Sequence, residues 1–68
     1  MKGRIEAFSD HRGDGTLRSE DGEGLYFHCV SIADGSRSID IGETVTARRG
    51  VGHLGRDEAF EIVRDARA

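Results

Sequence analysis

The sequence has no proline and no tryptophan, and Cys29 is its single cysteine. One cysteine cannot form a disulfide within the chain, and nothing in the composition points to an oxidising compartment. No stretch approaches the roughly 20 consecutive apolar residues of a membrane-spanning helix, and the first residues lack the apolar region of a secretory signal. We therefore expect a cytoplasmic protein with no membrane association.

Aromatic residues and net positive charge are also scarce. Three phenylalanines and one tyrosine make up 6% of the chain, and ten basic against thirteen acidic residues leave a net charge of −3. That balance argues against broad electrostatic attraction to phosphate groups. All basic residues except Lys2 are arginines, however, and arginine stacks on bases and forms bidentate contacts with phosphate.

The length allows one small domain. A chain of 68 residues buries only about 60% of the surface that it exposes when unfolded. Such a domain has no room for a large catalytic cavity behind a deep core. We therefore predict a protein that is not an enzyme and that carries no cofactor.

Ten glycines divide the chain into short segments. Within these segments apolar and polar residues alternate with the period of two that is typical of β-strands. The pattern predicts five strands, at residues 2–8, 15–19, 25–30, 43–49 and 59–63, and one helical turn at residues 30–33. Five short strands must close on themselves to cover their apolar face, so we expect an all-β, five-stranded barrel over residues 1–63, followed by a polar tail at residues 64–68.

Two glycine-containing motifs match ligand-binding patterns but lack the context that those patterns need. Residues 50–55, GVGHLG, match the dinucleotide fingerprint, which requires a following helix, a second strand and an acidic residue about 20 positions on. Only 13 residues remain after Gly55. Residues 10–15, DHRGDG, resemble the start of a calcium loop, but Arg12 and Asp21 occupy positions that need an oxygen ligand and a bidentate glutamate. We interpret both segments as strand connections.

The neighbours His28 and Cys29 are the remaining candidates for metal or nucleophilic chemistry. Adjacent residues of a strand point to opposite faces, and the chain has no second cysteine to complete a thiolate pair. His11 and His53 are not expected to converge with them. We predict no metal site and no catalytic pair, and we interpret Cys29 as a buried, small apolar residue.

One ordered set of residues resembles a known family. In chain order the segments are KGRI at residues 2–5, Phe8, RGDGTL at residues 12–17, LYFH at residues 25–28, Ile32 and GETV at residues 42–45. Their order and spacing over residues 2–63 resemble a cold-shock domain. The resemblance implies a five-stranded antiparallel OB-fold barrel whose first three strands bind single-stranded RNA or DNA, so that the protein acts as a nucleic-acid chaperone or regulator.

The resemblance also implies where nucleic acid binds. It assigns base stacking to Phe8, Tyr26 and His28, and it places Lys2 and Arg12 near phosphates. A guanidinium group can stack on a base as an aromatic ring does. We therefore add arginines near the same face to the predicted nucleic-acid-binding residues. The predicted nucleic-acid-binding residues are Lys2, Phe8, Arg12, Arg18, Tyr26, His28 and Arg37; Arg4 lies near the same face, and Arg48, Arg49 and Arg56 lie near the far loop.

Strand alternation predicts which aromatic residues are buried and which are exposed. Tyr26 and Phe27 are adjacent, so one faces the core and one is exposed, and the resemblance makes Tyr26 the exposed member. The position of Phe8 stays open between the core and the binding face. Phe60, where the family has alanine, either fills the core or forms part of a new surface.

The departures from the family pattern weaken the predicted binding. Other residues occupy five aromatic positions (Ala7, Asp14, Thr16, Cys29 and Ser36), and Glu6 replaces a lysine. At about 1 kcal/mol for each lost stacking contact, the affinity falls by roughly three or more decades. The alternative is a barrel whose binding face serves protein association, as a homodimer or on a partner protein, with nucleic-acid binding lost.

Overall fold

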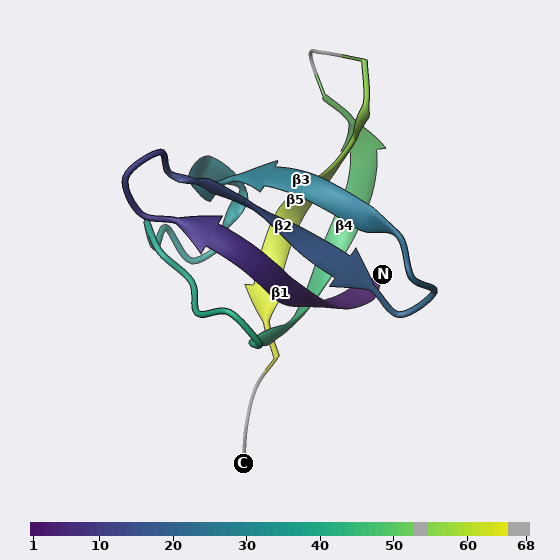
Figure 1. The fold of residues 1–68 in the computed structure, drawn as a ribbon, viewed down its shortest axis with the longest axis horizontal. Coiled ribbons are helices and arrows are strands. Elements are labelled where there is room, and N and C mark those ends of the chain that lie inside the picture. The colour runs from purple at the N-terminus through teal and green to yellow at the C-terminus, as the bar shows by residue number, and fades with distance from the viewer. Residues whose placement is uncertain (53–54, 66–68) are drawn as a thin grey trace.

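The computed structural model describes residues 1–52 and 55–65. Its elements are β1 (Lys2–Ser9), β2 (Asp14–Ser19), β3 (Gly24–His28), the short 3-10 helix η1 (Cys29–Ser31), β4 (Thr44–Val51) and β5 (Asp57–Arg64). The strands form a closed barrel in the order β1-β2-β3-β5-β4 (Figure 1). The predicted all-β fold, a five-stranded OB-like barrel, is confirmed.

One of the five strand contacts runs in the opposite sense to the others. β1 pairs antiparallel with β2 and with β4, and the β2–β3 and β4–β5 pairs are also antiparallel. The barrel closes where Tyr26 of β3 lies beside Glu58 of β5 in a parallel pair. The long connection through η1 and the whole of β4 separates these two strands, so no hairpin turn forces them to be antiparallel.

All five predicted strands are present, with ends within two residues of the prediction, and the end of β3 has a specific physical cause. The pattern predicts a strand through Val30, but the strand stops at His28 and residues 29–31 form η1. His28 caps this helix, because its Nδ1 accepts a hydrogen bond from the Val30 backbone N–H at 3.3 Å. The predicted helical turn therefore exists and begins one residue earlier than expected.

The core follows the alternation of the strands. Its largest fully buried side chain is Phe27, which is 0% exposed, whereas Tyr26 beside it is half-buried. This arrangement confirms the predicted division between the two residues. The buried apolar residues are Ile5, Leu17, Leu25, Phe27, Ile32, Ile39, Val45, Ala47, Ala59 and Ile62.

Arg64, at the end of β5, forms hydrogen bonds with the long connection that precedes β4. Its Nη1 donates to both carboxylate oxygens of Glu43, at 2.7 and 2.9 Å, and its Nε donates to Asp34 Oδ2 at 3.1 Å. Its Nη2 also donates to the carbonyl oxygen of Ser38 at 2.9 Å. Arg64 was expected in the polar tail, but it is the last residue of β5 and belongs to the barrel. Residues 66–68 of that tail lie outside the described residues.

This cluster predicts a specific loss of stability in acid. Hydrogen bonds from Ser36, and then from Arg64, lower the pKa of Asp34 from 3.8 to about 2. A carboxyl group whose pKa falls on folding stabilises the protein above its unfolded pKa, and this contribution is lost as the pH falls through the folded pKa. We expect Asp34→Asn to unfold at a lower temperature than wild type at pH 7, with the difference vanishing between about pH 4 and pH 2. Thermal unfolding followed by circular dichroism measures it; a constant difference down to pH 2 would contradict the assignment.

Within residues 1–52 and 55–65, no helix has the length and apolar character needed to cross a membrane.

Candidate nucleic-acid interface

The outer face of β1, β2 and β3 carries most of the predicted site. The strand register aligns Thr16 with Tyr26, and Asp14 with His28, so that Tyr26 and His28 lie two residues apart on the same side of β3. These side chains are half-buried or exposed. The connection between β1 and β2, which carries Arg12, borders this face.

Tyr26 is held from two directions. The guanidinium carbon of Arg56, in the β4–β5 connection, lies 4.9 Å from the centre of the Tyr26 ring. The Tyr26 hydroxyl donates a hydrogen bond to Asp14 Oδ2 at 2.8 Å. That hydrogen bond, followed by desolvation, raises the pKa of Tyr26 above its usual value of 10.0. The tyrosine ring is therefore part of a guanidinium–aromatic stack whose orientation is fixed.

Asp14 connects this stack to Arg12. Both Nε and Nη2 of Arg12 donate to Asp14 Oδ1, at 3.1 and 2.8 Å. The hydrogen bond from Tyr26, and then those from Arg12, keep the pKa of Asp14 below its usual value of 3.8. Asp14 is thus charged at neutral pH. It pairs with the guanidinium group of Arg12, which was predicted to contact phosphate.

His28 is exposed on the same outer face, next to Asp14 in the strand register. Its Nδ1 accepts a hydrogen bond from a backbone N–H of η1, and this contact fixes the imidazole ring at the end of β3. Arg37 is exposed and shares a surface hollow with His28 and Cys29. These two predicted residues are therefore brought together at the η1 end of the face.

Phe8 lies on the other side of the sheet. It is half-buried, and its ring stacks on Phe27 with the ring centres 5.9 Å apart and the planes 13° from parallel. The residues opposite it in the register, Gly15 and then Phe27, are both buried. The question that the sequence left open is answered by this packing, because Phe8 contributes to the core in the structure.

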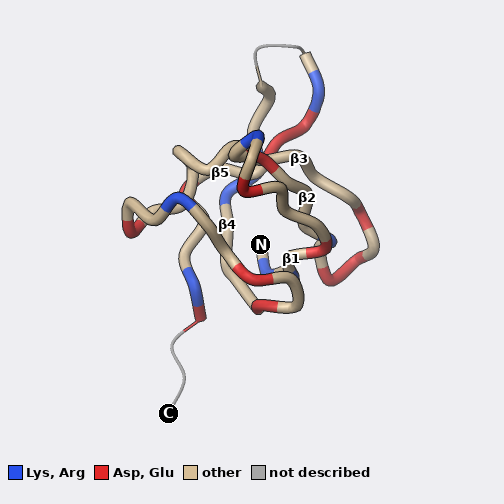
Figure 2. The backbone as a smooth tube through the Cα atoms, turned by 60° about the vertical axis from the view of Figure 1, so that its left-hand side comes forward, with Lys and Arg blue, Asp and Glu red and all other residues tan. Residues whose placement is uncertain are grey.

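Carboxylates pair with most of the basic residues. Arg18 Nη2 donates to both oxygens of Glu6 at 3.0 Å, and its Nη1 donates to the Gly22 carbonyl oxygen at 2.9 Å. Lys2 pairs with Asp65 at 3.2 Å. Further pairs join Arg48 to Glu61, Arg49 to Glu23, and Arg64 to Glu43 and Asp34. The backbone view shows the same interleaving of acidic and basic positions (Figure 2).

Three arginines stand apart from this pairing. In the part of the chain that the structure describes, Arg4, Arg37 and Arg56 form no ion pair with a carboxylate. Arg56 was named from the sequence only as an arginine near the far loop, and its contact with Tyr26 was not predicted. The available signal was its place in the connection between the last two strands, a segment that borders the binding face of OB barrels.

The His28–Cys29 neighbourhood contains no metal-binding cluster among the described residues. Cys29 is half-buried, packs against the core, and lies close to Gly13. Cys29 was predicted to be buried. It is only partly buried, because it lies in η1 at the edge of the core. His53 and Leu54 of the glycine motif lie outside the described residues.

Neither a protein-family model nor a curated protein matches this sequence.

Proposed function

We propose that the outer face of β2 and β3 binds single-stranded nucleic acid without catalysing a reaction. The observation that carries this proposal is the Tyr26–Arg56 stack, with exposed His28 beside it on the same face. In OB barrels this face, together with the connections β1–β2 and β4–β5, binds oligonucleotides. The cold-shock-like residue pattern supports the same assignment and the role of a chaperone or regulator.

The chemistry of the face suits bases better than phosphates. A base can stack on His28, and it can stack on the Arg56 guanidinium or displace it to reach the Tyr26 ring, since every base offers a π-face. Arg56 has no carboxylate partner among the described residues, so it is available to a phosphate group. Arg12 must leave Asp14 before it can do the same.

The proposed binding is weak. With only the rings of Tyr26 and His28 and few available cations, the dissociation constant should be roughly 10–100 μM at physiological salt, as for non-specific complexes, and lower at low salt. Each phosphate contact to a single strand contributes about −0.7 to the slope of log K against log salt concentration. Contacts at Arg56 and Arg12 together therefore predict a slope of about −1.4. A nucleic-acid ligand and the free Cys29 thiol are both compatible with a cytoplasmic location, which we propose together with this function.

Fluorescence anisotropy tests the proposal directly. A labelled pyrimidine oligonucleotide of about eight residues, the size that one OB domain covers, is titrated with protein at about 20 mM salt. We expect saturable binding that weakens with salt. The absence of saturable binding up to about 1 mM protein would refute the proposed function.

Asp14→Asn is expected to strengthen this binding by about threefold to tenfold. The substitution removes the charge that repels phosphate and that occupies Arg12, while the amide can still accept from the Tyr26 hydroxyl. The pKa of Tyr26, the only tyrosine, should fall toward 10 and can be followed by tyrosinate absorbance. Glu61→Gln, which removes a paired carboxylate on β5, serves as the control and should leave both quantities unchanged. Weaker binding by Asp14→Asn would contradict this role.

A second candidate function is association with another copy of the chain. Val30 of η1 is 81% exposed and lines a hollow together with Ala33 and the half-buried Phe60. Exposed aliphatic residues beside an aromatic ring are typical of interface centres. Sedimentation velocity on the order of 50 μM separates the two functions, because association predicts a concentration-dependent dimer that Val30→Asp abolishes.

A further inference from the structure

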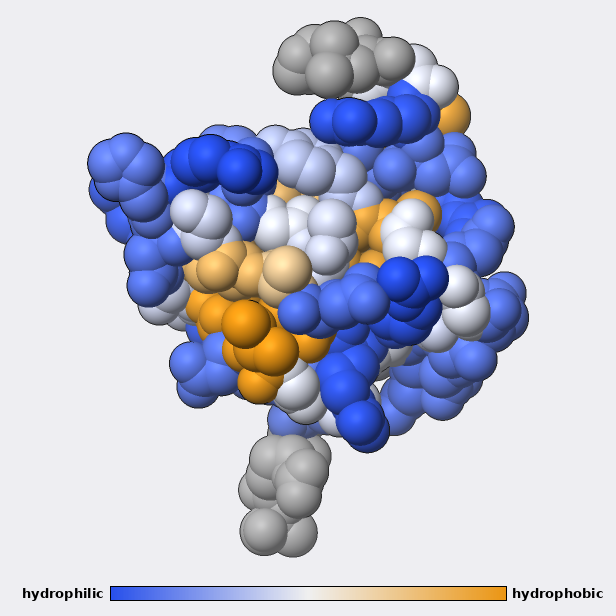
Figure 3. All heavy atoms as spheres, in the orientation of Figure 1, coloured by the Kyte–Doolittle hydropathy of each residue, from blue (hydrophilic) through white to orange (hydrophobic). Residues whose placement is uncertain are grey.

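A groove lies at the other end of the same outer face, away from Tyr26. It has a volume of about 510 Å³ and lies between the first half of β1, the end of β2 and residues 41–44. Its apolar surface comes from the rim residue Ile41, which is 68% exposed, whereas the neighbouring Ile5 is buried in the core. An apolar patch among hydrophilic side chains is visible on this side of the molecule (Figure 3). The groove is therefore suited to a ligand with an apolar portion.

The wall that carries Ile41 is anchored to the barrel. Gly42, with a φ of 92°, allows the turn before β4, and its N–H donates to the Ile5 carbonyl oxygen at 2.8 Å. The next residue, Glu43, accepts both hydrogen bonds from Arg64 described above. These contacts hold Ile41 out from the core and fix it beside β1.

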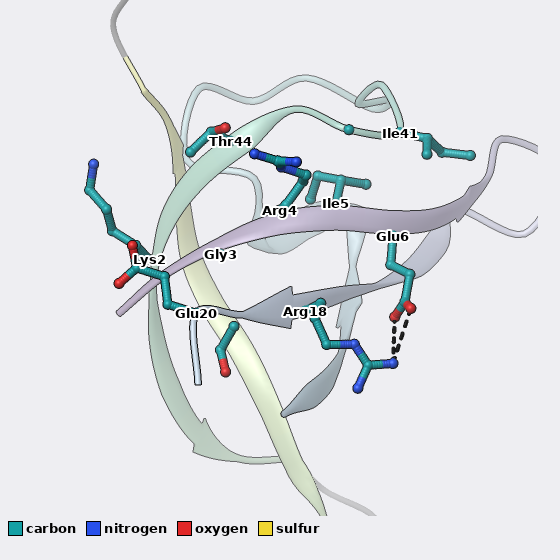
Figure 4. Close-up of a pocket in the computed structure, with 11 residues that line it drawn as sticks. Lys2, Gly3, Arg4, Ile5, Glu6, Arg18, Glu20, Ile41 and Thr44 are labelled. Atoms are coloured by element: carbon teal, nitrogen blue, oxygen red, sulfur yellow. Dashed lines mark hydrogen bonds and ion pairs between the residues drawn. The ribbon is translucent and has the colours of Figure 1, made fainter. Parts of the chain in front are cut away.

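Arg4 gives the groove a charge that no described carboxylate neutralises. Arg4 and Arg18 are direct cross-strand partners, an arrangement in which like charges repel. Arg18 points toward Glu6 and is paired with it, whereas Arg4 points toward the segment of Ile41 and Thr44 (Figure 4). An anion at Arg4 would relieve this repulsion, so the groove combines an apolar wall with an anion-binding group.

The remaining charges define where the anion can lie. Glu6 lines the groove, but both of its oxygens are engaged by Arg18. Glu20 lines the groove at its other end, beside Lys2 at the start of β1 in Figure 4, and it would repel an anion there. Lys2 at the same end is paired with Asp65. The favourable position for an anion is therefore between Arg4 and Thr44.

We propose that this groove holds a further nucleotide of the bound strand, with its phosphate on Arg4 and its sugar and base against Ile41. The inference rests on the proposed function and extends it by a second contact region. Both regions lie on the outer face of the same three strands. The Arg4–Arg18 row is two residues along β2 from the Thr16–Tyr26 row, which is about 7 Å along the strand. A single strand of several nucleotides can cover both.

The test compares pyrimidine ligands of two lengths. A single nucleotide bound at the Tyr26–His28 region cannot cover the groove at the same time, whereas a chain of about eight nucleotides can cover both. We expect Arg4→Ala to weaken the longer oligonucleotide about fivefold, to reduce its salt slope by about 0.7, and to leave the shorter one unchanged. Ile41→Ser should weaken the longer one about threefold with no change in salt slope. Arg48→Ala, which removes the same charge from β4, is the control.

The outcomes separate this inference from the function on which it rests. An equal loss for both lengths would make Arg4 a source of general attraction and would overturn the groove site. Binding of both lengths that neither variant alters would overturn it as well, while the proposed function would stand. The absence of binding by wild type at either length would refute the proposed function, and this inference with it. Both substituted residues are exposed, so circular dichroism should show unchanged folding.

Discussion

Tyr26→Ala should weaken the binding of a pyrimidine oligonucleotide by about tenfold to a hundredfold. A base that stacks on an aromatic side chain gains about 1–3 kcal/mol, and Tyr26 is the largest ring on the outer face of β3. The substitution also removes the surface that orients Arg56. Anisotropy titrations of wild type and variant under identical salt conditions measure the change.

Tyr26→Phe separates the ring from the hydroxyl. It keeps the stacking surface but removes the hydrogen bond to Asp14, so we expect affinity within about threefold of wild type. His28→Ala should cost less than Tyr26→Ala, because the imidazole offers a smaller surface. If Tyr26→Ala retains wild-type affinity while wild type itself binds, the strand lies on another surface, and the assignment of this face is wrong.

Gly15→Ala is expected to have the largest effect on stability of any single methyl group added to the barrel. A Cβ atom at Gly15 would lie 2.2 Å from the Ala7 carbonyl oxygen and 2.9 Å from the Phe8 Cα, and both are backbone atoms that cannot move aside. We expect the free energy of unfolding to fall by at least about 2 kcal/mol. A domain of this length has only about 3–10 kcal/mol in total, so this loss removes between about a fifth and two thirds of its stability.

Gly24→Ala is the matched control on the neighbouring strand. The nearest atoms to a Cβ atom there belong to the Arg18 guanidinium, at 3.6 Å, which is an ordinary contact. We expect a change within about 0.5 kcal/mol in urea unfolding. Equal destabilisation by the two substitutions would show that loss of glycine in a strand, rather than the close approach of β1 and β2, determines the effect.

The strands could be predicted because alternation is a local property. Residues such as Val45 and Ala47, or Leu25 and Phe27, follow the period of two that burial of one face imposes, and both pairs are buried. The break after His28 could not be predicted from that period. It depends on a hydrogen bond between the His28 side chain and the Val30 backbone, which competes with continuation of the strand.

The candidate site was predictable only in part, because its electrostatics come from residues far apart in the chain. Tyr26 and His28 occupy the outer face that the alternation of β3 requires. The contact of the Arg56 guanidinium with the Tyr26 ring depends on the pairing of Tyr26 with Glu58 of β5, a register that the local strand patterns do not specify. Likewise the Glu6–Arg18 ion pair joins two strands diagonally, beside a register shift between Ile5 and Ala7 that shows no sign in the sequence.

Asp14 on the proposed binding face has a structural role. Asp14 stands where the family pattern has a phenylalanine, and it joins Arg12 to Tyr26 in one hydrogen-bonded group. These polar contacts order this part of the outer face and keep Arg12 paired with a carboxylate. Under the proposed function, this pairing lowers the affinity of the face for phosphate.

Mapping of amide chemical shifts during titration with a pyrimidine octanucleotide tests the central claim most directly. The account predicts that the largest changes cluster on the outer face, at Thr16, Tyr26 and His28, and at Arg56, with smaller changes at Arg4 and Ile41. Amides of Thr46, Arg48 and Glu61 on the β4–β5 side should not change. Saturation with no perturbation at Tyr26 and His28, or perturbation centred on β4 and β5, would contradict it.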